Sequence, residues 1–130
     1  MYSATTKGIK VMVVPQYDEE RSRRDAGEYF WLYTIEIRNE GAVTAELKSR
    51  YWRITDANGK VQEVHGKGVV GVEPVIHPGQ AFRYTSGVPL QTATGFMGGH
   101  YNMLLESGEA IEVEIPAFSL DSPDTQKSVN

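Results

Sequence analysis

Residues 29–40 read YFWLYTIEIRNE, and this stretch decides the fold. Every second residue from position 29 to position 37 is large and apolar or aromatic: Tyr29, Trp31, Tyr33, Ile35 and Ile37. The intervening positions begin with Phe30 and Leu32 and then turn polar at Glu36 and Arg38. A period of two residues is typical of a β-strand, here buried on both faces at first and half-exposed later.

The same alternation recurs on both sides of this strand. It is plainest in AIEVEIP (110–116), and no long window has the period of an amphipathic helix. We expect about seven strands separated by turn residues, which favours an all-β, antiparallel β-sandwich. The expected strands lie near residues 7–17, 28–39, 46–57, 60–66, 79–86, 98–106 and 109–116. Asn58-Gly59 stands between two of them, and because both residues tolerate positive φ we predict a type I′ hairpin there.

The composition fits a single domain and excludes several kinds of chemistry. The chain has 130 residues, no cysteine and a formal net charge of −4. Without cysteine there are no disulfides, thiolate metal sites or thiol nucleophiles. Negative charge opposes binding to nucleic acid, and no apolar run is long enough for membrane insertion. We therefore expect a cytoplasmic protein. One sandwich domain should cover residues 1–123, followed by a flexible tail over 124–130. Residues 18–27 should form a solvated charged loop.

Residues 66–71, GKGVVG, match the GxGxxG pattern of dinucleotide-binding folds. That pattern needs a following helix, whereas Pro74, Pro78 and β-branched residues follow here, so we reject the dinucleotide-binding interpretation. A weaker hypothesis is that the loop binds phosphate or carboxylate through the candidate residues His65, Gly66, Lys67, Gly68 and Gly71. We favour the alternative that these glycines relieve crowding where strands cross or bulge.

Other candidate sites are sparse. The three histidines, His65, His77 and His100, have no local metal-ligand spacing, so we assign no metal site and expect only weak surface binding of a divalent cation. No catalytic motif is present, and we expect no enzyme activity and no cofactor. The chain is rich in aromatic residues, and the partner-contact candidates are Trp52 with its basic neighbours Arg50 and Arg53.

Several short motifs together resemble the ApaG (CorD) family of small bacterial proteins. They are YWRITD (51–56), GKGVVG (66–71), PG (78–79), FRYTSG (82–87), GFMGGHY (95–101) and PAFSL (116–120). The resemblance implies an immunoglobulin- or fibronectin type III-like sandwich, and an association with cobalt resistance and magnesium efflux. It also implies protein-interaction roles, as in eukaryotic relatives. Tyr51 and Val72-Glu73 depart from the family pattern and weaken any transfer of a metal site.

The leading functional hypothesis is therefore a non-enzymatic binding module for an unknown protein partner, linked to cobalt resistance or magnesium efflux. The first alternative is a phosphate- or nucleotide-binding protein that uses the loop at 65–71. The second alternative is direct binding of a divalent metal.

Overall fold

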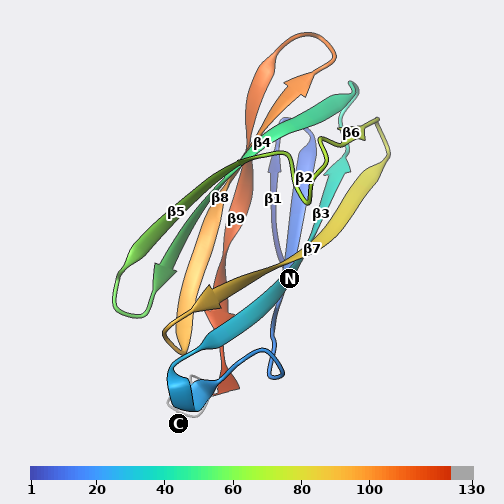
Figure 1. Ribbon diagram of the computed structural model, residues 1–130. Helices are drawn as coiled ribbons and strands as arrows, with labels where there is room; N and C mark the ends of the chain where they lie inside the picture. The colour runs from blue at the N-terminus through green and yellow to red at the C-terminus, as the bar shows by residue number, and fades with distance from the viewer. Residues whose placement is uncertain (124–130) are drawn as a thin grey trace.

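Two antiparallel sheets face each other in the computed structural model, which describes residues 1–123 (Figure 1). The first sheet has the order β1 (Tyr2–Thr6), β2 (Ile9–Tyr17), β3 (Tyr29–Asn39) and β7 (Ala81–Leu90). The second has the order β5 (Val61–Lys67), β4 (Ala45–Asp56), β8 (Thr94–Leu105) and β9 (Ala110–Asp121), and the short β6 (Val75–Ile76) pairs with β4. The predicted all-β sandwich is confirmed.

The seven predicted strands correspond to β2, β3, β4, β5, β7, β8 and β9. The prediction missed β6, which has two residues, and β1, whose sequence YSATT contains one large apolar side chain. β1 forms because its backbone pairs with β2 from Tyr2↔Val13 to Thr6↔Ile9. The predicted flexible tail, 124–130, lies outside the described residues.

The predicted charged loop at 18–27 has local structure of its own. The Ser22 hydroxyl donates to the Asp18 carbonyl at 2.7 Å and accepts from the Phe30 amide at 3.0 Å. Arg21 pairs with Asp18, and a single 3₁₀ turn spans Arg24–Ala26. Within residues 1–123 no helix has the length and apolar character needed to cross a bilayer.

The core lies between the sheets, and β3 supplies much of it. Trp31, Tyr33, Ile35 and Ile37 are buried, as their alternation predicts. Burial of such side chains stabilises the fold by roughly 1.5–3 kcal/mol each. The indole nitrogen of Trp31 also donates to the Asp121 carbonyl of β9 at 2.9 Å, so this ring both fills the core and ties the two sheets together.

A buried tyrosine pair joins the sheets a second time. The hydroxyls of Tyr84 on β7 and Tyr101 on β8 lie 2.5 Å apart. Burial is the main cause that raises the pKa of both phenols. Both therefore stay neutral, and each satisfies the hydroxyl of the other in an apolar region.

The two long sides of the sandwich differ. On one side β9 lies beside β1, and side chains of β1 accept hydrogen bonds from the backbone of β9. Thr6 Oγ1 accepts from the Glu114 amide at 3.1 Å, and the Tyr2 hydroxyl accepts from the Ser119 amide at 3.3 Å. Lys7 and Glu109 add an ion pair at 2.8 Å. On the other side β5 and β7 are the outermost strands of their sheets, and no such bonds join them among the described residues. The sandwich is thus closed along β1 and β9 and open along β5 and β7 (Figure 1).

The hairpin between β4 and β5 is present, but its predicted turn type is wrong. Gly59 has a φ of 82°, whereas Asn58 does not have positive φ, so the turn is not type I′. The Gly59 amide donates to the Asp56 carbonyl at 3.1 Å, and the Asp56 carboxylate accepts from the amides of Asn58 and Lys60. The Asp56 side chain thereby stabilises a three-residue turn in which only glycine adopts the left-handed conformation.

Replacing Tyr101 by Phe tests the tyrosine pair. The Y101F variant leaves the Tyr84 hydroxyl buried without its partner, and we expect the free energy of unfolding to fall by about 1–3 kcal/mol. Removing both hydroxyls in Y84F/Y101F restores matched apolar surfaces, so the double variant should be at least as stable as Y101F. Urea denaturation measures both values. A double variant clearly less stable than Y101F would contradict this assignment.

Candidate functional site

A β-bulge in β4 decides which side chains of this strand face inward. The pairing of β4 with β8 shifts register between Leu47 and Ser49, so Lys48 is an extra residue. Leu47 is buried ahead of the bulge, and Trp52 and Ile54 are buried after it, which shows that the alternation changes parity. Arg50 therefore shares the inner face with Trp52 instead of the solvent face.

The guanidinium of Arg50 is held at the open side of the sandwich by backbone acceptors. Its Nη1 donates to the carbonyls of Lys67 at 3.1 Å and Gly68 at 2.9 Å. Within residues 1–123 no carboxylate forms an ion pair with it. Arg50 is thus a positioned, half-buried cation whose charge is not neutralised by a neighbouring side chain.

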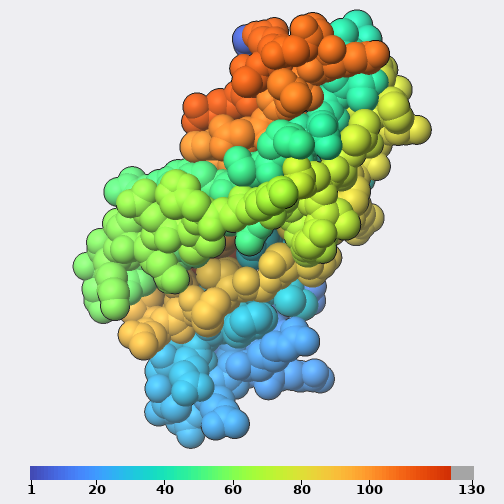
Figure 2. Space-filling view, turned by 45° about the horizontal axis from the view of Figure 1, so that its top comes forward, coloured from blue at the N-terminus to red at the C-terminus, as the bar shows by residue number. Residues whose placement is uncertain are grey.

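Three adjoining cavities follow the open side, and we call them together the open groove. The upper cavity of about 280 Å³ and the middle one of about 240 Å³ share four lining residues: Tyr33, Arg50, Trp52 and Ser86. The middle cavity shares Ile54, Gln62 and Pro89 with a lower one of about 430 Å³. Figure 2 shows the hollow between the green side chains of β5 and the golden side chains of β7.

Phenol and hydroxyl groups accompany Arg50 in the upper part of the groove. Burial raises the pKa of Tyr33, while a hydrogen bond with Ser86 and the charge of Arg50 oppose the rise. The charge of Arg50 acts in the same way on the pKa of Tyr84. These hydroxyls stay protonated at neutral pH, so a fixed cation and neutral hydroxyls face one space. Such groups suit recognition of an anionic oxygen.

The GxGxxG segment is a tight turn at the rim of this groove. Val69 and Val72 exchange backbone hydrogen bonds of 2.8 and 2.9 Å, and between them Val70 has a φ of 42° and Gly71 a φ of 82°. Positive φ at both central residues is the signature of the type I′ turn that we predicted at Asn58-Gly59. For a β-branched residue such as Val70 the left-handed conformation costs about 1–2 kcal/mol.

Two glycines of the motif make room for neighbouring atoms. A Cβ at Gly66 would lie 2.5 Å from the guanidinium carbon of Arg50. A Cβ at Gly68 would lie 2.2 Å from the Val72 carbonyl oxygen, and the φ of Gly68 is +62°. The Gly68 amide already donates to the Lys48 carbonyl at 2.9 Å. Relief of crowding, which we predicted for all three glycines, accounts for Gly66 and Gly68. It is wrong for Gly71, where an added Cβ would meet nothing within 4 Å and the positive φ is what favours glycine.

The structure separates the candidate residues that the sequence placed together. Lys67 lines the upper cavity and pairs with Glu73 at 3.3 Å, whereas the ring of His65 packs against Tyr51. Gly71 also lines that cavity. Of the partner-contact candidates, Arg50 and Trp52 line the groove, although Trp52 is buried in the core. Arg53 is exposed, and its place on the strand puts it on the opposite face.

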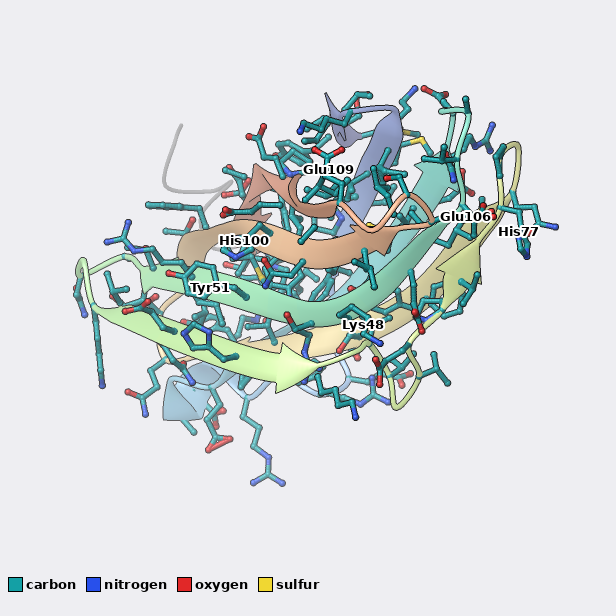
Figure 3. All side chains as sticks on the ribbon, turned by 90° about the horizontal axis from the view of Figure 1, so that it is seen from above. Lys48, Tyr51, His77, His100, Glu106 and Glu109 are labelled. Atoms are coloured by element: carbon teal, nitrogen blue, oxygen red, sulfur yellow. The ribbon has the colours of Figure 1, made fainter. Side chains whose placement is uncertain are left out.

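Two of the three histidines flank Tyr51 on the outer face of the second sheet. The ring centroids of His65 and His100 lie 4.9 and 5.0 Å from that of Tyr51, and Figure 3 shows Tyr51 and His100 next to each other. His77 lies well away from them and contacts Thr44 instead. In the described part of the chain no three His, Asp or Glu side chains gather closely enough to hold a metal ion together.

The sequence did not predict Tyr33, Tyr84 and Ser86 as groove residues, because it did not place β4 across from β3 and β7 of the other sheet. One signal was available. Apolar positions in β4 are odd-numbered at Ala45 and Leu47 but even-numbered at Trp52 and Ile54. That change of parity within one strand indicates a bulge and would have turned Arg50 inward.

Alanine at Gly66 and at Gly68 provides a matched pair of variants. In G68A the new methyl meets backbone in a left-handed conformation, and we expect a loss of about 2–3 kcal/mol in unfolding free energy. In G66A it meets only side-chain atoms of Arg50, which can move at the cost of their hydrogen bonds, so the loss should stay below about 1.5 kcal/mol while the guanidinium is displaced. Thermal unfolding and the NMR signal of the Arg50 side-chain Nε–H measure the two effects. Equal destabilisation by both variants would contradict this division.

The ion pairs beneath the turn predict a pH dependence. Lys48, 2.9 Å away, holds the pKa of Glu73 below its usual range. The lowered pKa means that the ionised form stabilises the folded state, and that this contribution is lost as the pH falls through that pKa. We expect the Gly68 amide to exchange faster in acid, after correction for the intrinsic rate, and E73Q to exchange faster already at neutral pH. An unchanged rate in E73Q would contradict the role of this ion pair.

Comparison of the sequence with known proteins identifies a family. The ApaG domain model matches residues 19–105. The proteins named Protein ApaG from Azorhizobium caulinodans and Xanthobacter autotrophicus are 59% and 56% identical over 130 residues, which is all of this chain and all of each relative.

Solved structures extend the agreement to three dimensions. A crystal structure from Bordetella pertussis, described as an ApaA protein, has a TM-score of 0.86 and 44% identity, and the match covers 88% of this chain and 94% of that one. A protein from Archaeoglobus fulgidus shares the fold alone, with a TM-score of 0.54 and 10% identity over 85% of this chain and 95% of that one. The chain therefore belongs to the ApaG family.

Proposed function

We propose that this chain is a non-enzymatic protein-interaction module whose partner binds along the open groove. The observation that carries the proposal is the unequal treatment of the two sides of the sandwich. β1 covers β9 with side-chain hydrogen bonds, whereas β5 and β7 end their sheets on either side of a continuous groove. An uncovered strand edge offers backbone groups to an added strand, and proteins protect edges that are not used.

The lining of the groove supports binding more than chemistry. Arg50, one of the residue types that contribute most to binding energy at interfaces, lies here beside the largely buried rings of Tyr33 and Trp52. The upper and middle cavities contain no His, Asp or Glu among their lining residues. A catalytic site of the usual kind needs a base within reach of a nucleophile or of a water. The two carboxylates that line the groove, Glu28 and Asp56, belong to the lower cavity and lie outside the part that contains Arg50.

We propose that the protein acts in the cytoplasm. Its partner should be sought among proteins of cobalt resistance and magnesium efflux, the processes with which the family is associated. Phosphate or nucleotide binding at residues 65–71 is the first alternative, since Lys67 supplies a positive charge at this rim. Direct binding of a divalent metal is the second. Calorimetry with pyrophosphate and with magnesium or cobalt tests both, because either alternative requires saturable heat at millimolar ligand.

Site-specific photocrosslinking tests the open groove directly. A benzophenone amino acid replaces Gln62 on β5 or Gln91 after β7, both exposed and both lining the groove. Matched control positions are Ser3 on β1 and Glu112 on β9, which are exposed on the closed side. We expect the same partner band from both groove positions in native lysate, with at least about a tenfold weaker band from the controls.

These substitutions change only exposed side chains, so circular dichroism should confirm an unchanged fold for all four. A partner captured equally from both sides, or only at Ser3 and Glu112, would contradict binding along the open groove.

A further inference from the structure

Val70 combines backbone strain with exposure. Its φ of 42° lies in the left-handed region, which β-branched residues avoid, and the residue is 56% exposed. Within residues 1–123 no burial of the isopropyl group compensates for this conformation. Val72 and Val75, which follow the turn, are 47% and 50% exposed. Strained residues of this kind concentrate where a protein binds something.

The charge beside Val70 is positive, although the protein as a whole carries a formal net charge of −4. Val70 lines the upper cavity together with Arg50 and Lys67, and no acidic residue belongs to that lining. Lys67 is 81% exposed and shares Glu73 with Lys48, whereas Arg50 has no carboxylate partner within residues 1–123. Local charge therefore selects an anionic group at this end of the groove.

The hydrogen-bonding capacity of Arg50 points to the same conclusion. Both of its hydrogen bonds to carbonyl oxygens come from Nη1. The N–H groups on Nη2 and Nε can therefore donate to another acceptor. The Lys67 and Gly68 carbonyls fix the orientation of the guanidinium before any ligand arrives. A planar, pre-oriented guanidinium is suited to a carboxylate, which accepts from two donors at once.

We propose that the partner contributes an extended acidic segment to the open groove, with a carboxylate on Arg50 and an adjacent apolar side chain against Val70 and Val72. This inference rests on the proposed function, and it adds the chemistry of the partner. Val70 and Val72 supply the apolar contact at the rim, and Arg50 supplies the charge inside the groove. Together they favour a side chain of Asp or Glu flanked by an apolar residue over a neutral strand.

A phage-displayed library of random heptapeptides, selected on the immobilised full chain, is the probe. We expect the enriched peptides to carry Asp or Glu next to an apolar residue, and their retention to fall about tenfold on R50Q. R50K keeps the charge without the planar fork and should give an intermediate loss. V70N should also lower retention while leaving the melting temperature equal or higher, because Asn tolerates positive φ better than Val.

Each outcome of the selection either supports or overturns the acidic segment. Enrichment without an excess of Asp or Glu, equal retention on R50Q, or no enrichment above the display background overturns the acidic segment. Displacement of the peptides by millimolar inorganic phosphate but not by acetate overturns it as well, in favour of a phosphate site. R50Q and V70N are first checked for an unchanged circular dichroism spectrum, and G66A, which displaces the guanidinium but retains its charge, should mimic R50Q.

The proposed function and this inference fail separately. Neutral peptides that crosslink at Gln62 and Gln91 would leave the open groove as the binding site and remove only the carboxylate. Crosslinks confined to the closed side would contradict binding in the open groove, whatever the sequence of the selected peptides.

Discussion

The β-bulge at Lys48 is the constraint on which the candidate site depends. One extra residue in β4 reverses the facing of every side chain that follows it. Arg50 and Trp52 turn toward the other sheet, and Tyr51 turns outward between His65 and His100. Two interactions of Lys48 hold the bulge against the glycine turn. The Lys48 carbonyl accepts from the Gly68 amide, and the Lys48 ammonium pairs with Glu73, which follows the turn. The bulge, the turn and the inward arginine therefore form one structural unit.

Edge protection explains why the groove lies on one side. Thr6 and Tyr2 satisfy amides of β9, and the Lys7–Glu109 ion pair lies at the same side. Such capping blocks edge-to-edge pairing between proteins. Along β5 and β7 the sheets separate instead, and the space between them is lined by aromatic rings and by Arg50. The two halves of the core are still held together by the Trp31–Asp121 and Tyr84–Tyr101 hydrogen bonds.

Sequence reasoning succeeded where a local pattern has one structural solution. Strict alternation in β3 predicted which of its side chains are buried. The two prolines that follow Gly71 ruled out a helix, and the chain there contains the short strand β6 after the tight turn at 69–72. It failed where two local solutions have similar energies. Asn58-Gly59 fits both a type I′ turn and a longer turn, and hydrogen bonds to the Asp56 carboxylate decided between them. β1 has too weak a pattern to be predicted, because its partner β2 holds it in place.

The sequence alone determined the all-β class, the positions of the long strands and the membership of the ApaG family, because alternation and short motifs are local properties of the chain. Tertiary structure decided where the glycine motif lies and what its neighbours are. Arg50 and Gly66 come together through the pairing of β4 with β5, while Tyr33 and Ser86 reach the groove from the opposite sheet. These contacts depend on register and on sheet packing, which no single stretch of sequence encodes.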